Sequence, residues 1–314
     1  MTDTTCPGGL GSIGGRAVAR IGYGAMQLGD TGSPDDAVAV LRRAVELGIN
    51  HLDTASFYGG GAVNTLIRQA LRPYRDDLVI VSKVGAVHVP DEPSPLAAAQ
   101  RPAQLRAAVE ADLKQLGLEQ ISVVNLRRLD LGPGLRAARD QIVDIDDQLA
   151  EMTALRDKGK IGAIGLSAVP VETVRHALPA GITCVQNAYS VLDRSQEDTL
   201  RLCAEECVAW VPFFPLGSAF PGFPSVTANP SVRTVAERIG ATPAQVGLAW
   251  LLAHSPNTLL IAGTRSLTHL EENAAAGSIQ LDAAALATLD RIGTMPADNT
   301  AHQHGAEPYL TEND

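Results

Sequence analysis

The amino-acid sequence predicts an α/β fold, a (β/α)8 barrel of the TIM type formed by residues 1–314 as a single domain. Strand-like and helix-like segments alternate until eight strands are counted, and this order is typical of a parallel barrel. The 314 residues, 45% of them hydrophobic and 19% charged, suffice for one large core. No linker that would divide the chain is found.

The N-terminal half is expected to form the first four strand–helix pairs. The helix at Pro102–Leu116 shows the pattern most clearly, because its apolar residues recur three and four positions apart. The expected strands are Ala25–Leu28, Asn50–Asp53, Leu78–Lys83 and Ser122–Leu126, and the helices are Asp35–Leu47, Ala62–Leu71, Pro102–Leu116 and Asp144–Lys158.

The C-terminal half repeats the alternation, and two elements lie outside it. Gly11–Ile21 predicts an N-terminal β-hairpin that caps the bottom of the barrel, and Asp282–Ile292 predicts an additional C-terminal helix. The expected strands are Ile161–Ser167, Thr183–Asn187, Ala209–Phe213 and Leu259–Ala262, and the helices are Val171–Leu178, Gln196–Glu206, Ser231–Ile239, Pro243–His254 and Leu267–Ala275.

Composition excludes several classes of protein. A net charge of −10 disfavours nonspecific binding to nucleic acid. No run of 18 apolar residues is present, so no membrane span is expected. The polar, glycine-rich start does not have the form of a signal peptide, and the four cysteines fit no zinc spacing. We expect a cytoplasmic protein without a metal, and the oligomeric state is not predicted.

Three residues in two short stretches suggest a proton-transfer set. Asp53 ends one expected strand, Tyr58 lies in the loop that follows it, and Lys83 ends the next strand. Strand ends on the carboxyl side meet at the mouth of a barrel, where active sites lie. A nearby ammonium stabilises a phenolate, and a carboxylate holds the ammonium in place. On spacing alone, a salt bridge beside a surface tyrosine is an equally good interpretation.

The order of several fragments resembles the aldo-keto reductase family. The resemblance runs from about residue 17 to residue 273 and begins with the stretch from Gly48 to Ala55, Tyr58-Gly59 and a strand that ends in Lys83. It implies that Tyr58 protonates a carbonyl oxygen while NADPH delivers hydride to the carbon, with Lys83 and Asp53 orienting Tyr58. Further matching fragments are Lys158–Ile161, Gly165–Ser167, Gln186-Asn187, Pro215–Ser218, Gly263–Arg265 and Glu272-Asn273.

One position departs from the family pattern. The segment from Val123 to Asp130 carries Arg127 where the family usually has a histidine. Arginine donates hydrogen bonds but is not a neutral acid–base relay near pH 7. We expect Arg127 to act in the catalytic site as an electrostatic clamp, and the alternative is an ion pair with Asp130 or with a carboxylate on a neighbouring loop. The stretch from Val123 to Arg127 is similar to a subgroup that includes bacterial pyridoxal reductases, which makes pyridoxal the first expected substrate and a keto-sugar the second.

The resemblance also implies a site for NADP(H). Ser167 and Gln186 match positions that bind the nicotinamide carboxamide, and Phe213 matches an aromatic residue that stacks on the ring. Arg265 at a helix start favours NADP(H) over NAD(H) through the 2′-phosphate. The remaining matches are Leu216, Gly217 and Ser218 for the pyrophosphate, Gly263 and Thr264 beside Arg265, and His269, Glu272 and Asn273 on the next helix.

Two functions from different classes remain open at this point. The leading one is NADPH-dependent reduction of an aldehyde or ketone, with a small carbonyl compound as the partner. The alternative is a non-catalytic NADPH-binding sensor or regulatory subunit, for which the missing histidine is an argument. The intact set of Asp53, Tyr58 and Lys83 favours the enzyme.

Overall fold

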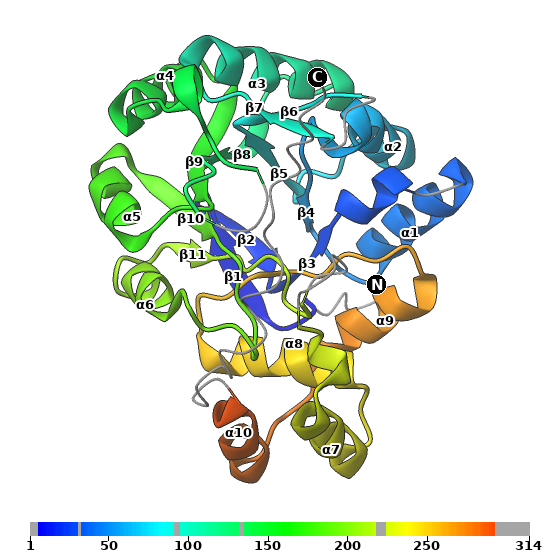
Figure 1. Ribbon diagram of the computed structural model, residues 1–314. Coiled ribbons are helices and arrows are strands. Elements are labelled where there is room, and N and C mark those ends of the chain that lie inside the picture. Colours follow the sequence, from blue (N-terminus) through cyan, green and yellow to red (C-terminus); the bar gives the residue numbers. More distant parts are fainter. Residues whose placement is uncertain (1–5, 31–32, 91–94, 132–134, 218–223, 293–314) are drawn as a thin grey trace, which may run out of the picture.

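The computed structural model describes residues 6–30, 33–90, 95–131, 135–217 and 224–292. Eight parallel strands form a ring in the order β11-β10-β9-β8-β5-β4-β3-β12, with helices around it (Figure 1). A parallel bridge between Trp210 and Thr258 closes the ring, and the predicted (β/α)8 barrel is confirmed. The strands are β3 (Ile21–Gly24), β4 (His51–Asp53), β5 (Val79–Val84), β8 (Ile121–Arg127), β9 (Ile161–Ser167), β10 (Ile182–Gln186), β11 (Ala209–Trp210) and β12 (Leu260–Ile261).

The helices pack their apolar faces against the outside of this ring. Their starts are fixed by local chemistry: Ser33 caps the first helix, and Thr242 and Gln245 form a capping box at the eighth. The helices are α1 (Pro34–Glu46), α2 (Ala62–Leu71), α3 (Pro102–Leu116), α4 (Ile145–Asp157), α5 (Val171–Ala177), α6 (Glu197–Glu205), α7 (Pro230–Ile239), α8 (Pro243–His254), α9 (Leu267–Ala275) and α10 (Ala283–Asp290). The last is the predicted additional helix.

The predicted hairpin caps one end of the barrel. Strands β1 (Leu10–Ile13) and β2 (Arg16–Ala19) pair antiparallel and lie at the centre of the ring in Figure 1. Gly14 and Gly15 both have positive φ, which a two-residue hairpin turn requires. Ile13 and Val18 are buried in one cluster with the side chains that fill the barrel, so the hairpin seals the core.

One predicted strand is wrong. Residues 25–28 do not form a strand; the first barrel strand is β3, and residues Met26–Asp30 form the short 3-10 helix η1. Strand β3 was not predicted because it contains two glycines, and glycine usually weakens a strand. Here a Cβ at Gly24 would lie 2.4 Å from the carbonyl oxygen of Ile261, so close strand packing requires glycine.

The loop between β5 and α3 contains structure that the sequence did not predict. It forms a second antiparallel hairpin, β6 (Ala86–His88) with β7 (Leu96–Ala98). Strand β11 is also shorter than expected and ends at Trp210, although Phe213 makes one isolated bridge to Ala188. The other short 3-10 helices are η2 (Tyr58–Gly61), η3 (Arg139–Gln141), η4 (Leu178–Ala180), η5 (Val226–Ala228) and η6 (Ala276–Ser278).

Candidate functional site

The proton-transfer set, Asp53, Tyr58 and Lys83, meets at the C-terminal ends of neighbouring strands. Asp53 ends β4, and Lys83 is the last residue but one of β5, the strand beside it. Tyr58 opens η2, and the three glycines that follow it all have positive φ, so the chain turns sharply before α2. The nitrogen of Lys83 lies 5.1 Å from the centre of the Tyr58 ring.

Lys83 is held as a buried cation. Its Nζ forms an ion pair with Asp53 Oδ1 and donates a hydrogen bond of 3.2 Å to the Thr54 carbonyl oxygen. Burial favours the neutral amine, but attraction to Asp53 and Tyr58 outweighs burial and raises the pKa of Lys83. The arrangement places a fixed positive charge beside the half-buried phenol of Tyr58.

Gln186 completes the surroundings of Asp53. Its Nε2 donates a hydrogen bond of 2.7 Å to Asp53 Oδ2, so both carboxylate oxygens have partners. Its Oε1 is buried without a hydrogen-bond partner among the described residues. An amide N–H donor would satisfy this acceptor, and the carboxamide of a nicotinamide is such a donor. Ser167 pairs with Gln186 in the sheet and is also buried.

Arg127 is connected to Tyr58 through the ring of Phe57. It ends β8, and its guanidinium lies 5.8 Å from the ring centre of Phe57, which packs edge-on against Tyr58. Burial lowers the pKa of Arg127, and attraction to Tyr58 opposes that shift. The alternative of an ion pair with Asp130 is wrong, because Asp130 pairs with Arg128 at 2.8 Å. Within the described part of the chain no ion pair involves Arg127.

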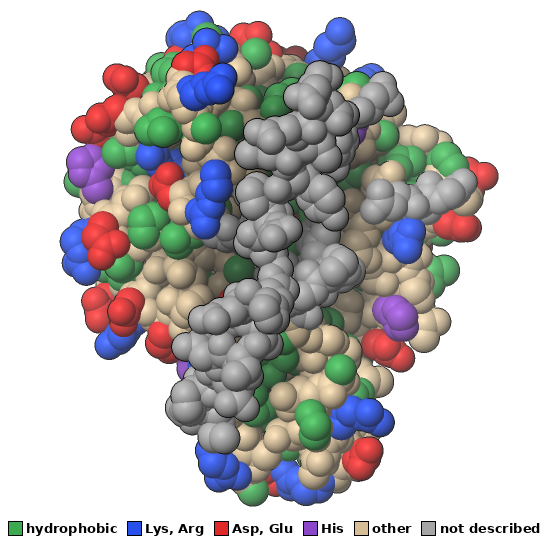
Figure 2. Space-filling view, viewed as in Figure 1, with side chains coloured by type: hydrophobic (Ala, Val, Ile, Leu, Met, Phe, Trp, Pro, Cys, Tyr) green, Lys and Arg blue, Asp and Glu red, His purple; other side chains and the backbone are tan. Residues whose placement is uncertain are grey.

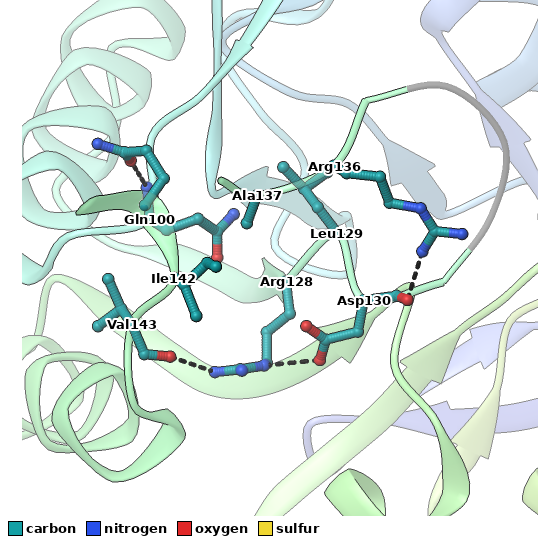
Figure 3. A pocket seen from close by; sticks show the side chains of 9 residues that line it. Gln100, Arg128, Leu129, Asp130, Arg136, Ala137, Ile142 and Val143 are labelled. Carbon is teal, nitrogen blue, oxygen red and sulfur yellow. Dashed lines mark hydrogen bonds and ion pairs between the residues drawn. The ribbon is translucent and has the colours of Figure 1, made fainter. Parts of the chain in front are cut away.

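A cavity of about 280 Å³ is lined in part by the segment that follows β8 (Figure 3). Arg128 crosses it, donating to Asp130 and to the carbonyl oxygen of Val143, and Arg136 reaches the carbonyl oxygen of Asp130. Neither Arg127 nor any member of the proton-transfer set lines this cavity, so it is not the candidate active site.

The expected cofactor residues that the structure describes lie at or after the C-terminal ends of the strands β9 to β12, or on α9. Phe213 is half-buried and packs edge-on against Phe214. Tyr23 donates a hydrogen bond of 2.6 Å to the carbonyl oxygen of Thr264, and Ser266 caps α9. Ser218 lies outside the described residues. The others are placed as follows: Leu216 and Gly217 follow β11 and are half-buried, Gly263 and Arg265 lie between β12 and α9, His269 is exposed, Glu272 is half-buried and Asn273 is buried.

The residues brought together by the fold include two that the sequence did not single out. Phe57 supports both Arg127 and Tyr58, and its position next to Tyr58 was the available signal. Gln100 is buried, and its amide donates to the carbonyl oxygens of Gly85 and Arg127. A glutamine 27 residues from Arg127 carries no signal of this contact in the sequence.

Two further observations bear on chemistry and location. Among the described residues, no group of three or more histidine, cysteine, aspartate or glutamate side chains could hold a metal ion. In the same part of the chain, no helix combines the length and apolar character of a bilayer span. Acidic and basic side chains are interspersed over the face shown in Figure 2.

The barrel and its site define a class of protein: an oxidoreductase that acts on carbonyl groups with a nicotinamide cofactor. The chain belongs to the aldo/keto reductase family, whose model matches residues 20–294. This confirms the family that the motifs indicated, and with it NAD(P)-dependent carbonyl reduction as the general activity.

Named relatives agree with this placement. The chain is 44% identical over 288 residues to pyridoxine 4-dehydrogenase of Escherichia coli, covering 90% of this chain and 97% of the relative. It is 34% identical to an uncharacterized oxidoreductase of Schizosaccharomyces pombe, covering 91% and 90%. An aldo/keto reductase of Klebsiella pneumoniae in complex with NADP and acetate superposes with a TM-score of 0.76 at 26% identity, covering 92% and 96%.

Proposed function

We propose that this protein reduces pyridoxal, or a closely related aromatic aldehyde, with NADPH, and that Tyr58 is the general acid. The observation that carries the proposal is the proton-transfer set beside an arginine that has no carboxylate partner among the described residues. The similarity to pyridoxine 4-dehydrogenase supports the substrate class, because dehydrogenation of pyridoxine at its 4-hydroxymethyl group and reduction of pyridoxal are the same reaction in opposite directions.

The chain's own residues supply the proton. Bound NADPH would supply the hydride for the carbonyl carbon. Tyr58 gives its phenolic proton to the carbonyl oxygen, and the ammonium of Lys83 stabilises the phenolate that remains. Asp53 keeps Lys83 charged and in place.

The residues around the mouth fit the cofactor. We assign Ser167 and Gln186 to the carboxamide, because the buried Oε1 of Gln186 lacks a donor, and Phe213 to the nicotinamide ring. We assign Arg265, at the start of the capped helix α9, to the 2′-phosphate. By the same resemblance, Leu216, Gly217 and Ser218 would hold the pyrophosphate, and Gly263, Thr264, His269, Glu272 and Asn273 the adenosine end. We also propose that the chain is a single domain.

In this proposal, Arg127 determines which aldehyde the enzyme prefers. A half-buried guanidinium attracts an anionic oxygen next to the carbonyl, and pyridoxal carries a phenolic oxygen beside its aldehyde. A hydrogen bond to a charged group contributes about 1.5–3 kcal/mol. Pyridoxal should therefore be preferred by about 10- to 150-fold over an aldehyde without that oxygen.

The test compares pyridoxal with an aldehyde that lacks this oxygen, and the Arg127 variants separate the effect of the oxygen from that of the other ring substituents. NADPH consumption is followed with pyridoxal and with pyridine-4-carbaldehyde, using wild type, Arg127→Met and Arg127→His. We expect wild type to turn over both and to prefer pyridoxal in kcat/KM, and Arg127→Met to lose the preference. An unchanged preference in Arg127→Met would make Arg127 structural. Tight NADPH binding without turnover of any aldehyde would favour the sensor subunit instead.

A further inference from the structure

A buried polar network lies on the outer side of the barrel wall, directly behind the proton-transfer set. Its centre is Asp112 on α3, which has no exposed surface. Asp112 Oδ2 accepts a hydrogen bond of 2.6 Å from Ser82, and Oδ1 accepts one of 2.7 Å from Asn64. Thr54 donates a hydrogen bond of 2.8 Å to Asn64 Oδ1. We refer to Asp112, Ser82, Asn64 and Thr54 as the outer network.

Each arm of the outer network ends next to a member of the proton-transfer set. Ser82 precedes Lys83 on β5, and because strand side chains alternate, the two point to opposite sides of the wall. Thr54 follows Asp53, and its carbonyl oxygen accepts a hydrogen bond from Lys83. The outer network therefore forms hydrogen bonds at the same two strand ends, of β4 and β5, that carry the ion pair inside the barrel.

The third arm reaches the loop of Tyr58. Asn64 lies in the first turn of α2, which begins directly after the turn that carries Tyr58. The side chain of Asn64 is buried and also donates to Gln115 on α3. A single side chain on α3 thus connects β5, the end of β4 and the start of α2.

Stability alone does not explain a carboxyl group at this position. No ion pair involves Asp112 in the described part of the chain, and burial raises its pKa to about 7 against the opposing effect of Ser82, Asn64 and Lys83. A buried carboxyl group without a cation in contact costs stability that a neutral side chain would not. Such costs concentrate at functional sites.

We propose that Asp112 is a positioning residue of the reductase, which holds Lys83, Asp53 and the Tyr58 loop in register from outside the barrel. This inference rests on the proposed function, in which Tyr58 donates the proton. Asp112 does not touch the reacting atoms; it acts through Ser82 and Asn64. Loss of the outer network should misplace the acid, and a misplacement of about 1 Å can slow a reaction by about 100-fold.

The test uses variants that separate hydrogen bonding from charge. Asp112→Ala removes both acceptors. Asp112→Asn keeps the shape, since its oxygen can accept from Asn64 and its N–H can donate to Ser82. Glu110→Ala, an exposed carboxylate on the same helix, is the matched control. For each variant, kcat, KM, NADPH affinity and the isotope effect with 4-deuterated NADPH are measured with pyridine-4-carbaldehyde.

We expect Asp112→Ala to lower kcat by about 10- to 100-fold, with NADPH affinity within about twofold of wild type and a larger isotope effect. Asp112→Asn should have a kcat within about threefold of the wild-type value, and Glu110→Ala should match wild type. A lower melting temperature with unchanged kcat and isotope effect would overturn the inference, because a structural role alone predicts that result. If Asp112→Ala does not fold, the same measurements on Ser82→Ala and Thr54→Val, which remove other hydrogen bonds of the outer network, test the inference by the same criteria. Absence of wild-type turnover would overturn the proposed function itself.

Discussion

Replacing Asp112 by asparagine should make the protein more stable at pH 8 while leaving its stability at pH 4 nearly unchanged. Burial raises the pKa of Asp112 from 3.8 to about 7 in the folded protein. Between these values the folded state binds more protons than the unfolded state, so stability is lost as the pH rises. A difference of about 3 pKa units at 1.36 kcal/mol each is on the order of 4 kcal/mol.

The measurement has to be a difference between proteins, because His51 titrates over the same range. Burial lowers the pKa of His51 from 6.5 to about 4, so the folded state binds fewer protons there and stability rises with pH. In wild type, the pH dependence of stability that comes from Asp112 therefore opposes the one that comes from His51. Subtracting the wild-type free energy of unfolding from that of Asp112→Asn removes the contribution of His51.

The assay is urea unfolding of both proteins at pH 4.5, 6 and 8, with Glu110→Gln as an exposed control. The stability advantage of Asp112→Asn should grow by several kcal/mol across this series, while that of Glu110→Gln stays constant. An advantage that does not depend on pH would refute the reasoning, because it would mean that Asp112 has the same proton affinity in both states.

Three other outcomes follow from the site. Tyr58→Phe should lower kcat by about 10² to 10⁴-fold and keep NADPH binding, since it removes only the phenolic hydroxyl that carries the acid proton; near-normal turnover would exclude Tyr58 as the general acid. Arg265→Ala should weaken NADPH binding by about 1.5–3 kcal/mol and leave NADH binding unchanged, and an unaltered ratio in fluorescence titrations would remove Arg265 from the site. Tyr23→Phe should destabilise the fold by about 1 kcal/mol and weaken NADPH binding, because it frees the carbonyl oxygen of Thr264; calorimetry and the same titration check both.

Much of the barrel was predictable because its periodic signals are local. Helices α2, α3, α8 and α9 and strand β9 have the predicted boundaries, since caps, prolines and apolar spacing act within a few residues. Strand β3 was missed because its glycines are required by close packing against residues far away in the sequence, such as Ile261.

In the site, too, contacts encoded by local patterns were predictable and contacts that depend on distant segments were not. The ion pair of Lys83 with Asp53 was predictable from a strand-end pattern and a family resemblance. Which arginine pairs with Asp130 was not predictable, because whether Asp130 reaches Arg127 or Arg128 depends on the loop after β8, where Leu129 takes a positive φ. The contact between Asp112 and Ser82 depends on how α3 docks, which no short segment encodes.

The two sides of the mouth are supported from outside the barrel by different chemistry. Behind Arg127, the amide of Gln100 donates to the carbonyl oxygen of Arg127, and Gln148 on α4 donates in turn to Gln100. Both side chains are buried amides, which do not titrate. Behind the proton-transfer set the central group is Asp112, whose pKa near 7 lets it change charge in the physiological range. The amides that support Arg127 do not titrate, whereas Asp112 does, so pH sensitivity arising from these outer contacts should appear in the proton-transfer step rather than in substrate binding. Because Asp112→Asn is expected to keep kcat within about threefold of wild type, this pH sensitivity should not exceed about threefold.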